Sequence, residues 1–289
     1  MGSADVVPGV SGGTVALVFG IYPQLVDTIR DGARALGRLA RADVRGAWSR
    51  LTRIDWAFLV PLLVGIFVAV VTLASVIARQ LKDNPQEMAG LFFGLVAGST
   101  VVAWRMQTSR TIRHLAVMMV TAVAVFVVLG WRAGPVVDPS PLAFFGAGAV
   151  AICAMILPGI SGSFLLLMLG MYGAVIDTVD DRAMGKAGIF ALGAVLGLAL
   201  FSTVLGRLLD TWFDWVMAAL IGLMLGSLRV LWPWPNGVGV ISENEDEVVS
   251  GTALHWPGAN EWFGPTALAV AAVFVVMMFD SYAGRRARV

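Results

Sequence analysis

Two similar stretches of this chain contain residues that could bind an anion. They read PGVSGGTVALVFGIYPQLVDTI from Pro8 and PGISGSFLLLMLGMYGAVIDTV from Pro158, so each places a Pro-Gly-x-Ser-Gly break in apolar sequence. A helix that begins at the serine offers unpaired N–H groups, a partial positive charge and hydroxyl donors, and its glycines allow close approach. We therefore predict an anion site at the paired breaks, although a single Pro-Gly would suggest only a packing kink. The predicted ligands are Ser11, Gly12, Gly13, Thr14, Ser161, Gly162 and Ser163.

Two further pairs of charged residues occupy matching positions. Arg79 and Arg207 could contact a phosphate from opposite sides of a membrane, or could be ordinary arginines that extend from helix ends to the interface. Asp27 and Asp177 could carry a coupling proton. Their position after the first helical segment favours plain interfacial carboxylates instead.

The composition is that of a polytopic α-helical membrane protein. Apolar residues form 58% of the 289 residues, charged residues only 13%, and the mean hydropathy is +0.83. Soluble domains of this size need far more charge, and a bilayer-spanning helix needs roughly 20 apolar residues. Cys153 is the single cysteine, which excludes an intrachain disulfide. The predicted spans are 56–78, 88–104, 115–131, 187–206, 215–232 and 265–282, and residues 142–157 and 161–179 flank the second break.

The two halves of the chain repeat each other. The opening stretches match at an offset of 150 with nine identities in 22 positions, and the similarity resumes at an offset of 128. An Arg-rich insert at about 30–54 explains the change of offset. We predict repeat 1 at residues 1–140 and repeat 2 at 141–289, each a broken helical hairpin followed by three transmembrane helices.

The distribution of charge predicts that the repeats are inverted. The Arg-rich insert, Arg105, Arg110, Arg113 and the arginines after Gly284 mark cytoplasmic segments, which also places the C-terminus inside. The loop at about 233–263 carries five acidic residues and no lysine or arginine, which suits the outside. Inverted repeats with broken helices are typical of secondary transporters, whose substrate site lies between the halves.

Two details of the first half follow from the repeat. The half-helices should run from Ser11 to about Ile21, before Pro23, and from Ser161 to about Met171, each near half the hydrocarbon thickness. Only seven residues precede Pro8, so we expect an apolar helix upstream of Met1 as the counterpart of 142–157.

The arginines of the insert fall on one face of an ideal helix, opposite leucines. This predicts an amphipathic helix on the anionic cytoplasmic leaflet, not a nucleic-acid site.

The residues resemble a bacterial family. GSADVVPGVSGGTVALVFGIY together with PGISGSFLLLMLGMY resembles the PopT-type polyprenyl-phosphate transporters over nearly the whole chain. The resemblance implies a flippase in the plasma membrane that returns undecaprenyl phosphate, the lipid carrier of cell-wall precursors, from the outer to the inner leaflet. Family members usually have a leading helix before the first motif. The resemblance implies no cofactor.

Two other functions are alternatives to lipid transport. A transporter or channel for a small soluble anion could use the same half-helix site. An intramembrane lipid phosphatase is disfavoured because His114 and His255 are the two histidines and neither lies in a metal-ligand or phosphatase-like cluster. The sequence therefore predicts a non-enzyme, and it leaves the coupling ion, prenyl chain length and oligomeric state open.

Overall fold

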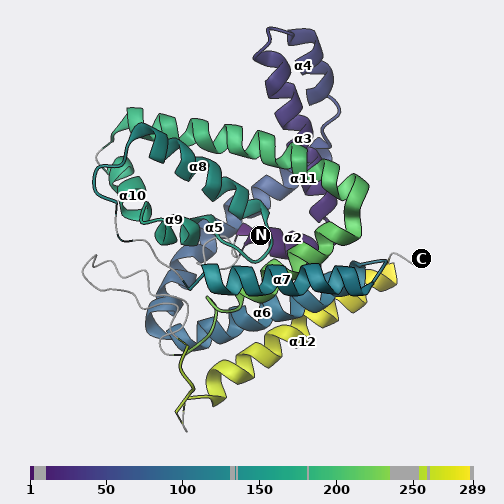
Figure 1. The fold of residues 1–289 in the computed structure, drawn as a ribbon, viewed down its shortest axis with the longest axis vertical. Coiled ribbons are helices and arrows are strands. Elements are labelled where there is room, and N and C mark those ends of the chain that lie inside the picture. The colour runs from purple at the N-terminus through teal and green to yellow at the C-terminus, as the bar shows by residue number, and fades with distance from the viewer. Residues whose placement is uncertain are drawn as a thin grey trace.

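The computed structural model describes residues 1–2, 11–130, 134, 136–180, 182–234, 254–258 and 261–286, and the regular structure in these ranges is helical without strands. The all-helical fold class is thus confirmed. Figure 1 shows the arrangement. The helices are α2 (Gly12–Val18), α3 (Tyr22–Leu39), α4 (Val44–Leu51), α5 (Trp56–Asp83), α6 (Pro85–Met106), α7 (Ile112–Val128), α8 (Pro141–Ile156), α9 (Gly162–Met168), α10 (Tyr172–Asp180), α11 (Met184–Ser227) and α12 (Phe263–Arg286).

Four of these helices, α5, α6, α11 and α12, are long and apolar enough to cross a membrane. The apolar helices α7 and α8 are shorter, with 17 and 16 residues. The helix α7 coincides with the predicted span 115–131, whose end at Trp131 lies outside the described residues, and α8 coincides with the segment 142–157 that was predicted to flank the second break. The chain is therefore a multi-pass membrane protein.

The helix α11 contains two predicted spans and bends between them. Trp212 has non-helical angles, φ −133° and ψ 41°. Asn84 lies 128 positions earlier, separates α5 from α6 and has φ −137° and ψ 60°. The two limbs of α11 therefore correspond in order and in bend to α5 and α6, at the same offset that relates the halves of the sequence.

The long helices pair between the two halves of the chain. The helix α6 packs against α12, and the second limb of α11 packs against α7 (Figure 1). A Cβ on Gly94 would meet the Ala269 carbonyl of α12, and a Cβ on Gly222 would meet the Met118 carbonyl of α7. Small residues at these positions let the backbones approach closely. Equivalent glycines therefore make equivalent contacts in both pairs.

The half-helices α2 and α9 have seven residues each, or about 10 Å, so our expectation that they reach Ile21 and Met171 is wrong. Gly20 and Gly170 have φ +68° and +69° and end them. The Ile21 N–H donates to the Ala16 carbonyl and the Met171 N–H to the Leu166 carbonyl, both at 2.9 Å, the bonds of a Schellman C-cap. Pro23 lies in the first turn of α3 and does not terminate α2.

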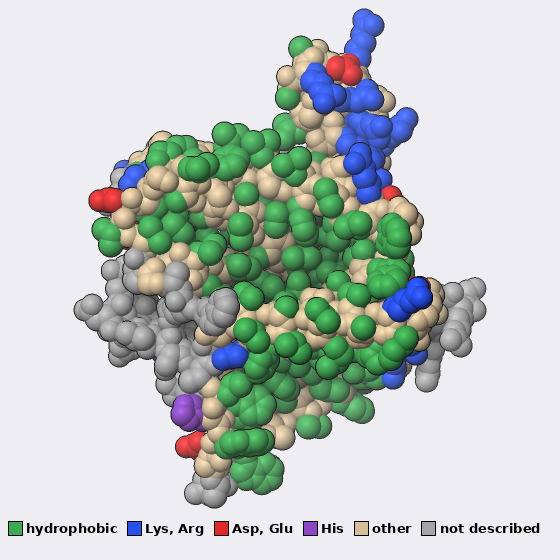
Figure 2. All heavy atoms as spheres, viewed as in Figure 1, with side chains coloured by type: hydrophobic (Ala, Val, Ile, Leu, Met, Phe, Trp, Pro, Cys, Tyr) green, Lys and Arg blue, Asp and Glu red, His purple; other side chains and the backbone are tan. Residues whose placement is uncertain are grey.

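The Arg-rich insert is a helical hairpin, so the prediction of one amphipathic helix over 30–54 is wrong. The helix α3 ends at Leu39, the chain turns through Ala42 at φ +58°, and α4 packs back on α3. The hairpin projects from the body of the protein (Figure 1), and basic side chains gather on it (Figure 2). Leu39 and Trp48 are exposed on the same hairpin.

Candidate functional site

The structure places the first break against the second. The Gly159 N–H donates to Thr14 Oγ1 at 2.8 Å, and Ser11 Oγ donates to the Met155 carbonyl at 2.8 Å. A Cβ on Gly13 would meet the Ile156 carbonyl. Pro8 and Gly9 of the first break lie outside the described residues. Residues 144 and 145 positions apart in the sequence thus form one cluster between the two breaks.

The hydroxyls of the two breaks have different partners. Ser11 accepts from the Gly13 N–H at 3.0 Å and so caps α2. In the second copy Ser161 Oγ and Ser163 Oγ bond each other at 2.7 Å, and no side chain in the described structure caps α9. Ser11, Thr14 and Ser161 are at most 4% exposed. The helix N-terminus of the second break is therefore more available to a ligand. In the first break, the serine hydroxyl already makes structural hydrogen bonds.

The glycines of the breaks also serve helix packing. A Cβ on Gly162 would meet the Ala151 carbonyl of α8, and Gly159 has φ +88° close to Met224 of α11. Bulky substitutions here would displace helices as well as block a ligand. Serine substitutions are therefore the better probes of anion binding.

The two arginines that we considered as phosphate ligands lie on exposed helix surfaces. Arg79 is 83% exposed and its Nε lies 3.4 Å from Asp83 Oδ2, one turn along α5. Arg207 is exposed on α11. The described hydrogen bonds of the two breaks include neither arginine, so these contacts do not place either guanidinium beside the serines.

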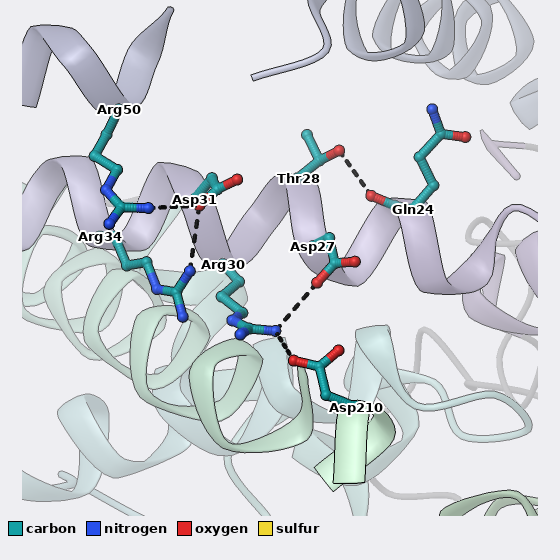
Figure 3. A network of polar contacts seen from close by, with 8 residues as sticks. All are labelled: Gln24, Asp27, Thr28, Arg30, Asp31, Arg34, Arg50 and Asp210. Carbon is teal, nitrogen blue, oxygen red and sulfur yellow. Dashed lines mark hydrogen bonds and ion pairs between the residues drawn. The ribbon is translucent and has the colours of Figure 1, made fainter. Parts of the chain in front are cut away.

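The two aspartates occupy unlike surroundings. Arg30 Nη1 lies 3.2 Å from Asp27 Oδ1 and 2.7 Å from Asp210 Oδ2 (Figure 3), and the Arg30 side chain is 13% exposed. It lies over Gly206, where a Cβ would meet its Cδ. Asp177 is exposed on α10. Arg30 therefore links α3 of the first half to α11 of the second and is not a residue of the basic surface alone.

Sequence reasoning did not single out Asp210 or Arg229. Asp210 separates two predicted spans, and Arg229 lies within one, so an isolated charge in apolar sequence was the available signal. Arg229 Nη1 donates to the Phe126 carbonyl at 3.1 Å, and its guanidinium lies 4.7 Å from the Phe126 ring centroid. Its neighbours Trp232 and Trp256 line a cavity of about 400 Å³.

The chain thus combines membrane-spanning helices with two helix breaks that contact each other in a buried position. Interrupted helices that meet in this way are typical of secondary transporters. The chain belongs to the VCA0040-like family, described as undecaprenyl phosphate translocase-like, which matches residues 1–249. This confirms the resemblance drawn from the two motifs.

Two relatives carry the same name. A polyprenyl-phosphate transporter of Vibrio cholerae serotype O1 is 35% identical over 295 residues, covering 98% of this chain and 94% of the relative. A polyprenyl-phosphate transporter of Staphylococcus aureus is 30% identical over 251 residues, covering 81% and 83%. No solved structure matches the chain.

Proposed function

We propose that this protein is a flippase for undecaprenyl phosphate or a related polyprenyl phosphate. It carries the lipid from the outer to the inner leaflet of the bacterial plasma membrane, which returns the carrier for cell-envelope synthesis. The family and the names of both relatives support the substrate class. The observation on this chain that carries the proposal is the Thr14–Gly159 hydrogen bond, which joins the two helix breaks in one buried cluster.

The phosphate binds where the breaks meet. In the structure the Ser161 and Ser163 hydroxyls bond each other at 2.7 Å, and a phosphate oxygen would take the place of that mutual bond. The N–H groups of the first turn of α9 point the same way as the helix dipole and add donors. The first break contacts the phosphate through Ser11, Gly12, Gly13 and Thr14. In the second break, Gly162 allows the phosphate to approach closely. Arg79 and Arg207, exposed on their helices, meet the anion at the membrane surfaces and not in the breaks.

Alternating access follows from inverted repeats, residues 1–140 and 141–289, with the C-terminus in the cytoplasm. The matching bends at Asn84 and Trp212 and the matching pairs α6–α12 and α11–α7 support two equivalent halves. In such an arrangement one half rocks against the other around a fixed site. Asp27 and Asp177 are the candidates for proton coupling, and Asp27 is restrained by Arg30.

Transport in liposomes tests the proposal. Purified protein should move a fluorescent polyprenyl phosphate between leaflets, and the Ser161→Ala, Ser163→Ala double variant should bind it at least about tenfold more weakly, because each donor to an anion is worth roughly 1.5–3 kcal/mol. Ser99→Ala is the matched control, since Ser99 is buried like Ser161 and, within the described part of the chain, bonds only the Leu95 carbonyl of its own helix.

Four results would contradict the proposal. The first is unchanged lipid movement in the double serine variant, and the second is equal loss in the Ser99 control. Movement of inorganic phosphate without movement of the lipid would instead indicate a transporter of small soluble anions. Release of inorganic phosphate from the lipid would indicate an enzyme.

A further inference from the structure

An apolar cavity of about 540 Å³ lies at the bend of α11. Both limbs of α11 line it, with Leu205, Leu208 and Trp212 before and at the bend and Ala219 and Leu220 after it. Thr121 of α7 is the single hydroxyl among its lining residues. The volume is within the range of small-molecule sites, roughly 300–1,000 Å³, but the lining offers almost no polar group to orient a polar ligand.

The cavity runs from the surface of the protein into its core. Leu208 and Trp212 are 43% and 54% exposed, whereas Leu205 and Leu220 are 5% and 3% exposed. Hydrophobic side chains cover the face between α11 and α7 in Figure 2. An apolar chain that enters at the exposed rim would therefore be surrounded along its length by protein side chains instead of lipid.

The inner end of the cavity adjoins the second break. Leu157 lines the cavity, ends α8 and is four positions before Ser161. Four residues span at most about 14 Å even when extended. An apolar chain in the cavity can therefore be attached to a headgroup at the serines of the break.

The bend by itself does not explain the apolar lining. At an offset of 128, Leu208, Trp212 and Trp215 correspond to Gln80, Asn84 and Glu87, and Asn84 has almost the same backbone angles as Trp212. The equivalent bend in the first half is thus built from polar residues. Apolar residues are a property of this cavity and not of the bend.

The wall of the cavity is held in place by contacts outside it. The Trp215 ring lies edge-on to His114 with centroids 4.6 Å apart. Thr111 Oγ1 and His114 Nδ1 lie 3.2 Å apart in the capping box of α7. A wall that is already ordered costs a ligand less entropy on binding.

We propose that this cavity holds the first isoprene units of the polyprenyl chain, while the phosphate lies in the breaks. The assignment rests on the proposed function, because a chain site is needed only if the substrate is a prenyl lipid. The remainder of the chain stays in the bilayer beyond Trp212. The cavity therefore makes affinity depend on chain length, by roughly fourfold for each methylene it buries.

The test uses full-length protein in nanodiscs and two probes, isopentenyl phosphate and a geranylgeranyl phosphate with a diazirine in its chain. The parent should bind the longer probe much more tightly and crosslink within residues 205–223. Ala219→Phe fills the cavity and should weaken binding of the longer probe at least about tenfold, with little effect on the shorter one. Ala191→Phe, the same change at an exposed position of α11 outside the lining, should leave both affinities near the parent values.

The outcomes separate the two proposals. If the parent binds the longer probe but Ala219→Phe keeps its full preference for it, or if phosphatidylglycerol competes equally for the crosslink, the cavity is not the prenyl site and the proposed function stands. Failure of the parent to bind the longer probe would contradict the proposed function and this site together. Leu208→Asn, at the exposed rim, gives the same comparison should Ala219→Phe fail to fold, and it should lower the preference for the longer probe.

Discussion

At the scale of single residues, the serine of the repeated motif makes different hydrogen bonds in the two halves. Ser11 caps its own helix and donates to Met155, whereas the hydroxyl of Ser161 bonds only Ser163 among the described contacts. Ser11→Ala therefore removes an N-cap, at a cost of about 1 kcal/mol, as well as any contact with an anion. Loss of transport in a Ser11 variant would not by itself identify a ligand, but loss in a Ser161 variant would.

Thr14 gives a prediction about stability. Thr14→Val keeps the shape of the side chain and leaves the buried Gly159 N–H without its acceptor, which should cost about 1–3 kcal/mol and lower the midpoint of thermal unfolding in detergent by several degrees. Thr100→Val is the control, because the Thr100 hydroxyl donates to a carbonyl within its own helix. Equal shifts in the two variants would show that the contact between the breaks contributes nothing of its own.

At the scale of elements, a glycine of positive φ at the C-terminus of each half-helix sets the length of that helix. Gly20 and Gly170 end α2 and α9 at the same point in each copy. The length of each half-helix is therefore fixed by backbone conformation at its C-terminus and not by the proline that follows in the first copy.

Gly20→Ala isolates this conformational effect. A Cβ at Gly20 meets nothing within 4 Å, so the variant should lose about 1–2 kcal/mol from the φ of +68° alone. Gly32→Ala is the matched control, because Gly32 also has open space but lies within α3, where alanine should stabilise by up to about 1 kcal/mol. Opposite shifts in unfolding temperature are expected, and a neutral Gly20→Ala would contradict the argument.

Sequence patterns located the elements better than their ends or their partners. Apolar runs placed α5 to α8 and α12 within a few residues, because burial in lipid imposes a composition on the whole segment. The turn at Ala42 had no glycine or proline to mark it, so two helices were taken for one. Arg30 and Asp210 are 180 positions apart, and one sequence carries no local signal for such a pair.

The sequence predicted which residues form the candidate site but not the contacts that they make. The repeated motif gave the residues of both breaks, and the hydrogen bond from Gly159 to Thr14 brings those breaks together. Ser11 and Ser161 differ in their hydrogen-bond partners because different carbonyls and hydroxyls lie opposite them. Those neighbours are set by three-dimensional packing. The apolar cavity also needed the structure, because its lining comes from three separate segments.

At the scale of the whole molecule, the orientation of the two halves remains a prediction from charge. Single cysteines at Ser49 in α4 and at Gly258, both exposed, in a Cys153→Ala background should react with an impermeant maleimide from opposite faces of the membrane. Ser49 lies in the Arg-rich hairpin and Gly258 in the acidic loop, most of which lies outside the described residues. Reaction of both from one face would exclude the inverted arrangement.

The pairing of α6 with α12 also has a consequence for how the protein is made. Residues 85–106 leave the ribosome long before residues 263–286, so α6 must wait in the bilayer until the last helix is synthesised. During that interval the groove of Gly90, Gly94 and Gly98 has no backbone against it. Ribosome-stalled chains that stop before α12 should therefore expose this groove to membrane chaperones and proteases, and completion of the final helix should end that exposure.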